Sequence, residues 1–337
     1  MSRPSAAGPL LALALLMLGV ALAFAVGRYP VAPGDAARVL LAKLTGGSAS
    51  VPPAVEAVVL QIRGPRIAAA ILVGGALAAA GAAFQGLFRN PLVSPDILGA
   101  SSGAALGAVL GIWLSLGVLG IELLAFAGGL AAVAAVYAIG TALGRRDPVL
   151  VLVLAGIVVG SLLGAGIGLM KFLADPYNQL PAMTFWLLGS LSAMHAADLV
   201  PLLVPVVAGT GLLLLLRWRL DVLSLPDEEA RALGLATGRL RLAIVAAATL
   251  VTAASVAAAG IVGWIGLVVP HLARFLVGPG FGRLLPVSAL LGGATLLVID
   301  TLARTLTPVE VPLGVLTALV GTPLFLVLLV RADRDWQ

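Results

Sequence analysis

The sequence predicts an all-α polytopic membrane protein: a single transmembrane permease-like domain over residues 1–337, with about ten helices of the length that a bilayer requires. Composition is the first reason, because 61% of the residues are hydrophobic and only 10% are charged. A soluble domain carries about 25% charged residues, so a chain this poor in charge must turn most of its surface toward lipid. The second reason is that the apolar residues fall into long runs bounded by glycine, proline and charge.

These apolar runs define the expected elements, and most of them approach the roughly 20 residues that cross a hydrocarbon core. The eighth run lies between Gly260 and Pro270 and is too short for a full crossing. We therefore expect it to form a half-helix buried among other helices. The predicted spans lie near residues 10–27, 65–86, 97–117, 122–143, 149–170, 196–216, 241–259, 261–271, 284–303 and 312–330.

The first run also has features of a secretory signal peptide, with Arg3 before it and Ala-Phe-Ala at 23–25. It is long for the apolar core of a signal peptide, and many further spans follow it. We expect a retained first helix, and a cleaved signal is the alternative.

An even number of spans puts both termini on one side of the membrane. If that side is the cytoplasm, most of the 20 lysines and arginines fall in inner segments, as the positive-inside rule requires. These residues are scattered singly at the ends of apolar runs, so we expect contact with membrane lipid and no nucleic-acid partner.

A weak internal repeat is present. Ala78-Ala-Ala-Gly81 recurs as Ala257-Ala-Ala-Gly260, and the same shift maps Pro91 onto Pro270 and Gly99 onto Gly278. Chance is a strong alternative in a chain so rich in alanine and glycine. If the repeat is real, it pairs the second span with the seventh, so the two halves run in opposite directions, as in many transporters.

Several kinds of site are excluded by the residue types present. The chain has no cysteine, and neither of its two lysines, Lys43 and Lys171, follows the glycine-rich loop of a nucleotide-binding motif. The two histidines, His195 and His271, lie far apart in the expected topology. We therefore expect no catalytic residue, no metal site and no cofactor in this chain, which is not an enzyme. Any ATP and Mg²⁺ would be bound by another polypeptide.

The longest cytoplasmic segment, residues 217–241, predicts a short helix outside the membrane. Ser224 suits its N-cap, Pro226 its first turn and Gly234 its C-terminal end. A charged loop of this kind is usually only solvated, but so complete a helix favours docking of a partner. The residues expected to carry that contact are Asp227, Glu228, Glu229, Ala230, Arg231, Leu233 and Gly234.

The fifth span carries a stripe of glycines on one helix face, Gly156, Gly160, Gly164 and Gly168. Tight packing within the chain is one explanation. The other is a helix that lines a pathway or a subunit seam, where bulky side chains would block passage.

Taken together, the motifs resemble those of the FecCD-type permeases of bacterial ABC importers, the type II family that serves cobalamin, haem and ferric siderophores. The matching motifs follow the family order from about residue 60 to the C-terminus. They are the segments at 61–66 (QIRGPR), 81–85 (GAAFQ), 89–99 (RNPLVSPDILG), 260–274 (GIVGWIGLVVPHLAR), 300–304 (DTLAR) and 310–314 (EVPLG).

The resemblance implies a ten-helix subunit in the bacterial inner membrane that pairs with a second copy of itself. It also implies two cytoplasmic ABC ATPase subunits and a periplasmic substrate-binding protein as partners. The family's coupling helices fall on residues 223–241, and Pro226 stands where a glycine is usual. The family's outer arginines, which pair with glutamates of the binding protein, fall on Arg63 and Arg304. An ion pair with Asp300 in the same helix is the alternative for Arg304.

The resemblance therefore implies uptake of an iron chelate, haem or ferric siderophore, or of cobalamin, driven by a separate ATPase. A rival function is an ion-coupled secondary transporter. Such coupling normally uses an ionisable group inside the membrane, for which Asp300 is the only plausible candidate in the sequence.

Overall fold

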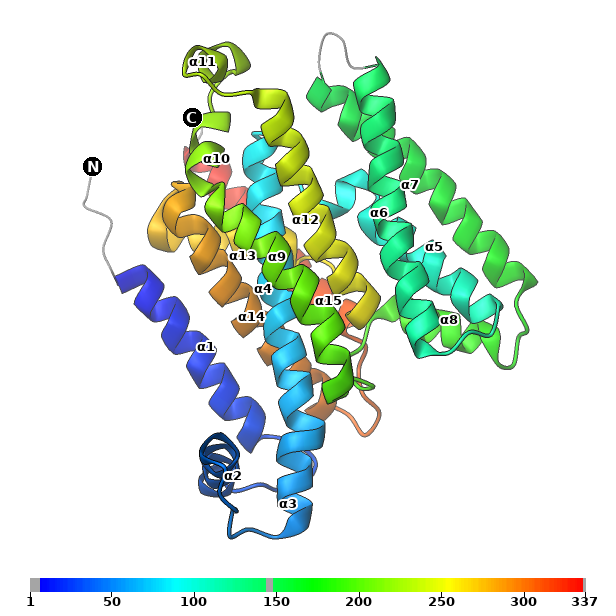
Figure 1. The fold of residues 1–337 in the computed structure, drawn as a ribbon, viewed down its shortest axis with the longest axis vertical. Helices are drawn as coiled ribbons and strands as arrows, with labels where there is room; N and C mark the ends of the chain where they lie inside the picture. The colour runs from blue at the N-terminus through cyan, green and yellow to red at the C-terminus, as the bar shows by residue number, and fades with distance from the viewer. Residues whose placement is uncertain (1–6, 144–147, 336–337) are drawn as a thin grey trace.

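The computed structural model describes residues 7–143 and 148–335, with the side chains at 148, 227 and 329–335 outside that description. Every regular element in these ranges is a helix, so the all-α prediction is confirmed (Figure 1). Arg3, Arg145 and Arg146, three of the basic residues expected inside, lie outside the described residues. Two ends of the molecule serve as landmarks: the α11 end and, opposite to it, the α2 end (Figure 1).

Ten apolar helices overlap the ten expected runs. Within the described residues, seven of these helices are long and apolar enough to cross a membrane, counting Pro53–Leu87 as one helix, and three are shorter. The ten are α1 (Ala7–Ala25), α4 (Gly64–Leu87), α5 (Ala100–Trp113), α6 (Val118–Leu143), α7 (Pro148–Leu173), α9 (Leu199–Leu215), α12 (Thr237–Ala259), α13 (Ile265–Val277), α14 (Phe281–Thr305) and α15 (Leu313–Asp335).

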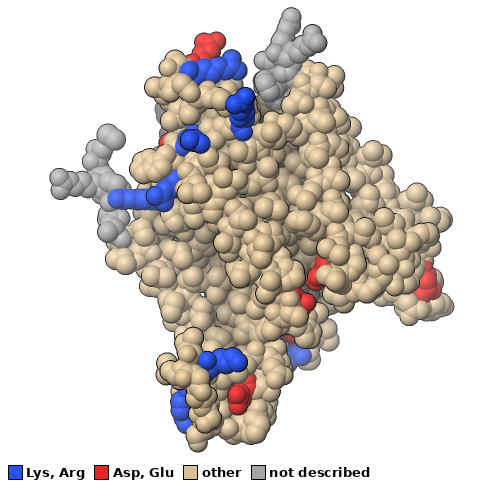
Figure 2. All heavy atoms as spheres, viewed as in Figure 1, with Lys and Arg blue, Asp and Glu red and all other residues tan. Residues whose placement is uncertain are grey.

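The remaining helices are short and lie mostly at the two ends. At the α2 end, α3 and the π-helical turn η1 continue directly into α4. The short helices are α2 (Pro33–Thr45), α3 (Pro53–Ala57), η1 (Val58–Arg63), η2 (Pro95–Leu98), α8 (Gln179–Leu188), η3 (Ala196–Asp198), α10 (Arg217–Leu223) and α11 (Asp227–Ala232). Between the two ends, the visible face is mostly uncharged (Figure 2).

Helix α4 is the centre of the bundle. In its most apolar stretch 78% of the residues are buried, against 17% for α7. It packs against α9, α12, α13 and α14, and α1 lies along α14. The sequence of α4 explains this position, because small residues such as Ala78 to Gly81 let helix backbones approach closely on every side.

The eighth apolar element differs from its predicted bounds. Helix α13 begins at Ile265 and runs to Val277, so Pro270 lies inside it rather than at its end. The start is delayed because Gly260 and Trp264 both have a φ of +68°, which keeps residues 260–264 out of helical geometry. At 13 residues the helix is still too short for a full crossing, as expected for a half-helix.

The contact between α4 and α13 depends on a glycine. A Cβ atom at Gly81 would lie 1.8 Å from the carbonyl oxygen of Gly266. That carbonyl lacks its usual helical donor because Pro270, four residues later, has no N–H. Only glycine at position 81 lets α4 lie this close to the first turn of α13.

The internal repeat agrees with the structure in direction but not in register. Helices α4 and α12 run in opposite directions, as the repeat predicts (Figure 1). The repeated Ala-Ala-Ala-Gly lies in the interior of α4 but at the very end of α12. Gly99 precedes α5, whereas Gly278 follows α13. The matched residues therefore do not occupy equivalent places in the two helices.

Candidate functional site

Helix α11 stands at one end of the molecule, beyond the ends of the long helices (Figure 1). A Schellman motif closes it: Leu235 N–H donates to the Ala230 carbonyl at 3.2 Å, and Gly234 N–H donates to the Arg231 carbonyl at 2.9 Å. Gly234 has the left-handed φ of +83° that this motif requires. The expected role of Gly234 at the end of the helix is therefore correct.

The beginning of α11 differs from the prediction. Ser224 does not cap it, because the Ser224 hydroxyl donates to the Asp221 carbonyl at 2.6 Å. Pro226 is the N-cap rather than part of the first turn, with extended backbone at ψ 146°. The last residues of the predicted coupling region 223–241, residues 237–241, form the first turn of α12.

The side chains of α11 form a small exposed face. Glu228, Glu229 and Arg231 are exposed, and Leu233 is 64% exposed. Ala230 is fully buried and holds the helix against the body of the protein. The side chain of Asp227 lies outside the described part of the structure. This exposed face therefore combines one apolar side chain with charged ones.

The glycine stripe of α7 divides into one packed residue and three open ones. A Cβ atom at Gly156 would lie 2.0 Å from the Ile97 carbonyl oxygen, so this glycine fixes α7 against η2. At Gly160 the nearest atom is the Ser102 hydroxyl at 4.0 Å, and at Gly164 and Gly168 nothing lies within 4 Å. Packing within the chain explains only Gly156, and the other three leave a smooth, open strip on the helix.

Arg63 and Arg304 lie near the α2 end, but neither is a free surface group. Arg63 is 4% exposed and donates to the carbonyls of Phe24 and Tyr29. Arg304 is 8% exposed and donates to the Ala23 carbonyl at 2.7 Å. Both side chains tie the end of α1 and the loop after it to the bundle. The contact with a binding protein that the resemblance implies for them stays a prediction.

Arg66, which the sequence did not single out, is the centre of a buried charge network at this end. Its Nε donates to both carboxylate oxygens of Asp300, at 2.9 and 3.0 Å. Its Nη1 and Nη2 donate to the two oxygens of Glu310, at 3.0 and 2.9 Å. Arg304 adds a longer contact of 3.8 Å to Asp300, so the ion pair expected as its alternative is present.

This network gives Asp300 a structural role. Its side chain is fully buried, and Arg66 engages both of its carboxylate oxygens. A carboxylate neutralised in this way is poorly suited to carry a coupling ion, because it would first have to break bidentate charge-assisted bonds. The geometry therefore disfavours the ion-coupled rival.

The residues of the matching motifs near α13 also have structural partners. Gln85 donates from Nε2 to the Leu267 carbonyl at 3.1 Å and accepts from Arg274 at 2.6 Å. His271 Nε2 lies 2.8 Å from the Pro91 carbonyl oxygen. These bonds join α4, the loop after it and α13. Among the described residues no group of three or more His, Cys, Asp or Glu side chains is placed to hold a metal ion.

Several known proteins that are similar in sequence to this chain are permease proteins of import systems. The chain is 36% identical over 320 residues to the molybdate import system permease protein of Haemophilus influenzae, covering 95% of this chain and 94% of that one. It is 44% identical to the cobalamin import system permease protein of Halobacterium salinarum, covering 85% and 76%. It is 40% identical to the hemin transport system permease protein of Yersinia pestis, covering 81% and 83%.

A solved structure supports the same relationship. This structure is described as an inward-facing conformation of a metal-chelate type ABC transporter. The similarity covers 96% of this chain and 98% of the transporter chain, with a TM-score of 0.86 and 35% sequence identity. The model of the FecCD transport family matches residues 15–331, nearly the whole length. The chain therefore belongs to the FecCD transport family, as a multi-pass membrane permease.

Proposed function

We propose that the chain is the membrane-spanning subunit of an ABC importer, in which two copies enclose a pathway and each copy engages one ATPase through α11. The observation that carries this proposal is the placement of α11, an exposed helix beyond the bundle of a transport-family permease. Its exposed Leu233 and flanking charges supply the contact surface. This assignment puts the α11 end in the cytoplasm and the α2 end outside.

The pathway is proposed to run along the open part of the α7 stripe, Gly160, Gly164 and Gly168. Among the long helices of the described chain, α7 has the smallest share of buried residues in its most apolar stretch, 17%. A strip without side chains gives a passing ligand no strong hold, which suits a large ligand that must be released rather than retained.

The stripe has its own test. Replacing Gly164 with leucine is expected to abolish uptake, because the larger side chain would project into the proposed pathway. Assembly with the ATPase should persist, because a Cβ atom at this position meets no atom of the chain within 4 Å. Gly211→Leu is the matched control, since Gly211 lies in α9 and is also open. Normal uptake by the Gly164→Leu variant would show that α7 does not line the pathway.

The proposed cargo is a metal chelate: haem, a ferric siderophore or cobalamin. The relatives that transport hemin and cobalamin support this class, and the solved relative is of the metal-chelate type. The molybdate permease matches a larger share of the chain, 95% against 85% and 81%, so this oxyanion is the competing cargo.

A binding protein is proposed to deliver the cargo at the α2 end. Because Arg63 and Arg304 are buried, we propose that they stabilise the docking surface rather than contact the partner directly. Arg28 is exposed and donates to the carbonyls of Arg304 and Thr307, so an exposed guanidinium lies next to the backbone of Arg304. Carboxylates of a partner would meet this guanidinium first.

The experiment is uptake into proteoliposomes that contain the chain with its ATPase and binding protein. Haem, a ferric siderophore, cobalamin and molybdate are offered in parallel. Uptake of one ligand that needs ATP and both partners supports the importer and identifies its cargo. Uptake that persists without an ATPase would instead favour the ion-coupled transporter.

A further inference from the structure

A long apolar groove runs along the side of the bundle between α6, α9 and α12. Its two hollows have volumes of about 630 Å³ and about 530 Å³ and share Ala208 and Leu250, so they form one continuous groove. It exists because α12 packs against both α6 and α9, whereas α6 and α9 have few contacts with each other. We call this the α6–α9–α12 groove.

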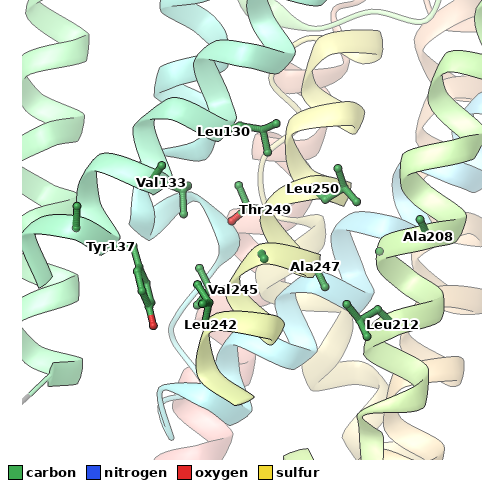
Figure 3. Close-up of a pocket in the computed structure, with 14 residues that line it drawn as sticks. Leu130, Val133, Tyr137, Ala208, Leu212, Leu242, Val245, Ala247, Thr249 and Leu250 are labelled. Atoms are coloured by element: carbon green, nitrogen blue, oxygen red, sulfur yellow. The ribbon is translucent and has the colours of Figure 1, made fainter. Parts of the chain in front are cut away.

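The half toward the α11 end is lined by aliphatic side chains of all three helices (Figure 3). Among the residues that line this half, Tyr137 and Thr249 are the two that carry a hydroxyl group. The half toward the α2 end has an alanine floor, Ala254, Ala257 and Ala258, with Phe126 and Leu119 on one wall. Both halves face outward between membrane helices, so hydrocarbon is the medium that fills them.

Acidic side chains interrupt this apolar lining at one place. Glu122 of α6 and Asp198 at the start of α9 both line the half of the groove toward the α2 end. Figure 2 shows acidic atoms on this face of the molecule. Asp198 accepts from its neighbour His195, with N–H to Oδ2 at 2.8 Å and Nδ1 to Oδ2 at 3.7 Å. In the described part of the chain, neither carboxylate has a lysine or arginine partner.

We propose that the α6–α9–α12 groove binds a phospholipid whose headgroup carries a primary ammonium, with that ammonium held between Glu122 and Asp198. One acyl chain then lies on the alanine floor toward Leu250. Two carboxylates at the rim of a membrane groove need a cation, and an ammonium supplies both charge and N–H donors. The match of charge selects this headgroup over an anionic one.

The dimensions agree with this occupant. The groove follows α6 from Leu119 to Ala138, a rise of roughly 29 Å at 1.5 Å per residue. This approaches the roughly 30 Å hydrocarbon thickness of a bilayer, so each half matches one leaflet. Glu122 lies one turn from the α2 end of α6, close to the end of the groove where the headgroup of a lipid in that leaflet would lie.

The test is native mass spectrometry of the detergent-purified permease complex, titrated with phosphatidylethanolamine, phosphatidylcholine and phosphatidylglycerol of identical acyl chains. We expect phosphatidylethanolamine to be retained most strongly. Glu122→Gln combined with Asp198→Asn should lower its retention about tenfold, the loss of roughly one charge contact, and remove the preference among headgroups. Glu56→Gln, an exposed carboxylate on α3 at the same end, is the matched control and should change neither.

The groove itself is tested by filling it. Ala208 is exposed at the junction of the two halves, so Ala208→Phe occupies the groove without entering the core. It should reduce retention of all three lipids, whereas Leu13→Phe on the exposed face of α1 should not.

Equal retention of the three headgroups by the unaltered protein would overturn the proposal. So would an unchanged preference in the double variant, or a groove filled by a second polypeptide. None of these measurements requires transport, so their outcome is independent of the proposed function.

Discussion

Arg66 connects parts of the chain that are far apart in sequence. It bonds Asp300, 234 residues away, and Glu310, 244 residues away, so one guanidinium ties α4 to α14 and to the segment before α15. Its side chain is 9% exposed and that of Asp300 is fully buried. At the scale of single residues, this is where the α2 end depends most on one side chain.

Replacing Arg66 with methionine should destabilise the protein by about 3–5 kcal/mol, because the buried Asp300 would lose its bidentate partner and keep only the 3.8 Å contact with Arg304. Thermal unfolding in detergent measures the change. The control is Arg38→Met, which removes an exposed ion pair to Asp35 of 2.9 Å and should cost at most about 1 kcal/mol.

Adding Asp300→Asn to Arg66→Met should recover part of the lost stability, since the uncompensated charge is then gone. A loss as small as that of Arg38→Met would mean that the network contributes little. A double variant no better than the single one would point to lost packing of the Arg66 stem instead.

The roles of the arginines at the α2 end could be predicted from the sequence only in part. Arg63 and Arg304 were found because they sit at the ends of apolar runs and in matching motifs. Their burial and their carbonyl partners depend on how α1 folds against α14, which no local pattern records. Arg66 has the same surroundings in sequence as Arg63, and only the contacts with Asp300 and Glu310 distinguish it.

Among the helices, the closest approach that a single residue controls is between α4 and α13. Gly81→Ala places a Cβ at 1.8 Å from the Gly266 oxygen, so one helix must move. We expect a loss of about 1–3 kcal/mol or more, the usual range for overpacking. Lowered yield of folded protein in detergent and a lowered unfolding temperature are the measurements.

Gly211→Ala in α9 is the control for this helix contact, because nothing lies within 4 Å of the added atom. Alanine favours helix over glycine by roughly 1 kcal/mol, so this variant should be as stable as the parent or more so. Equal unfolding temperatures for the Gly81→Ala variant and the parent would show that α13 adjusts freely, and the tight crossing would then have no energetic consequence.

Helix lengths and order followed from hydropathy, because each long run must satisfy its own backbone hydrogen bonds in lipid. The start of α13 did not follow, since it depends on left-handed backbone at Gly260 and Trp264 that hydropathy does not encode. The separate α10 was missed for a similar reason. It differs from α9 only by a break at Leu216, within a continuous apolar and basic run.

At the scale of the whole molecule, the asymmetry of the two ends bears on how transport would be driven. The α2 end is closed by buried charge pairs and by α2, α3 and the loop after α1. The α11 end presents a short helix in which, among the side chains that the structure describes, Ala230 is the buried one. This difference between the two ends agrees with the proposal that a partner engages the protein at the α11 end.

This asymmetry yields a prediction about the ATPase. Leu233 is 64% exposed and sits at the end of α11, where an apolar side chain would be buried by a docked partner. Leu233→Asp should abolish co-purification of the ATPase and ATP-driven uptake, while the unfolding temperature of the permease stays unchanged. Leu44→Asp is the matched control, because Leu44 is 83% exposed on α2 at the opposite end.

If both variants retain the ATPase, α11 is not the coupling contact. If both lose it, the effect comes from an added exposed charge rather than from α11. Loss with Leu233→Asp alone would identify the surface through which ATP hydrolysis reaches the membrane helices.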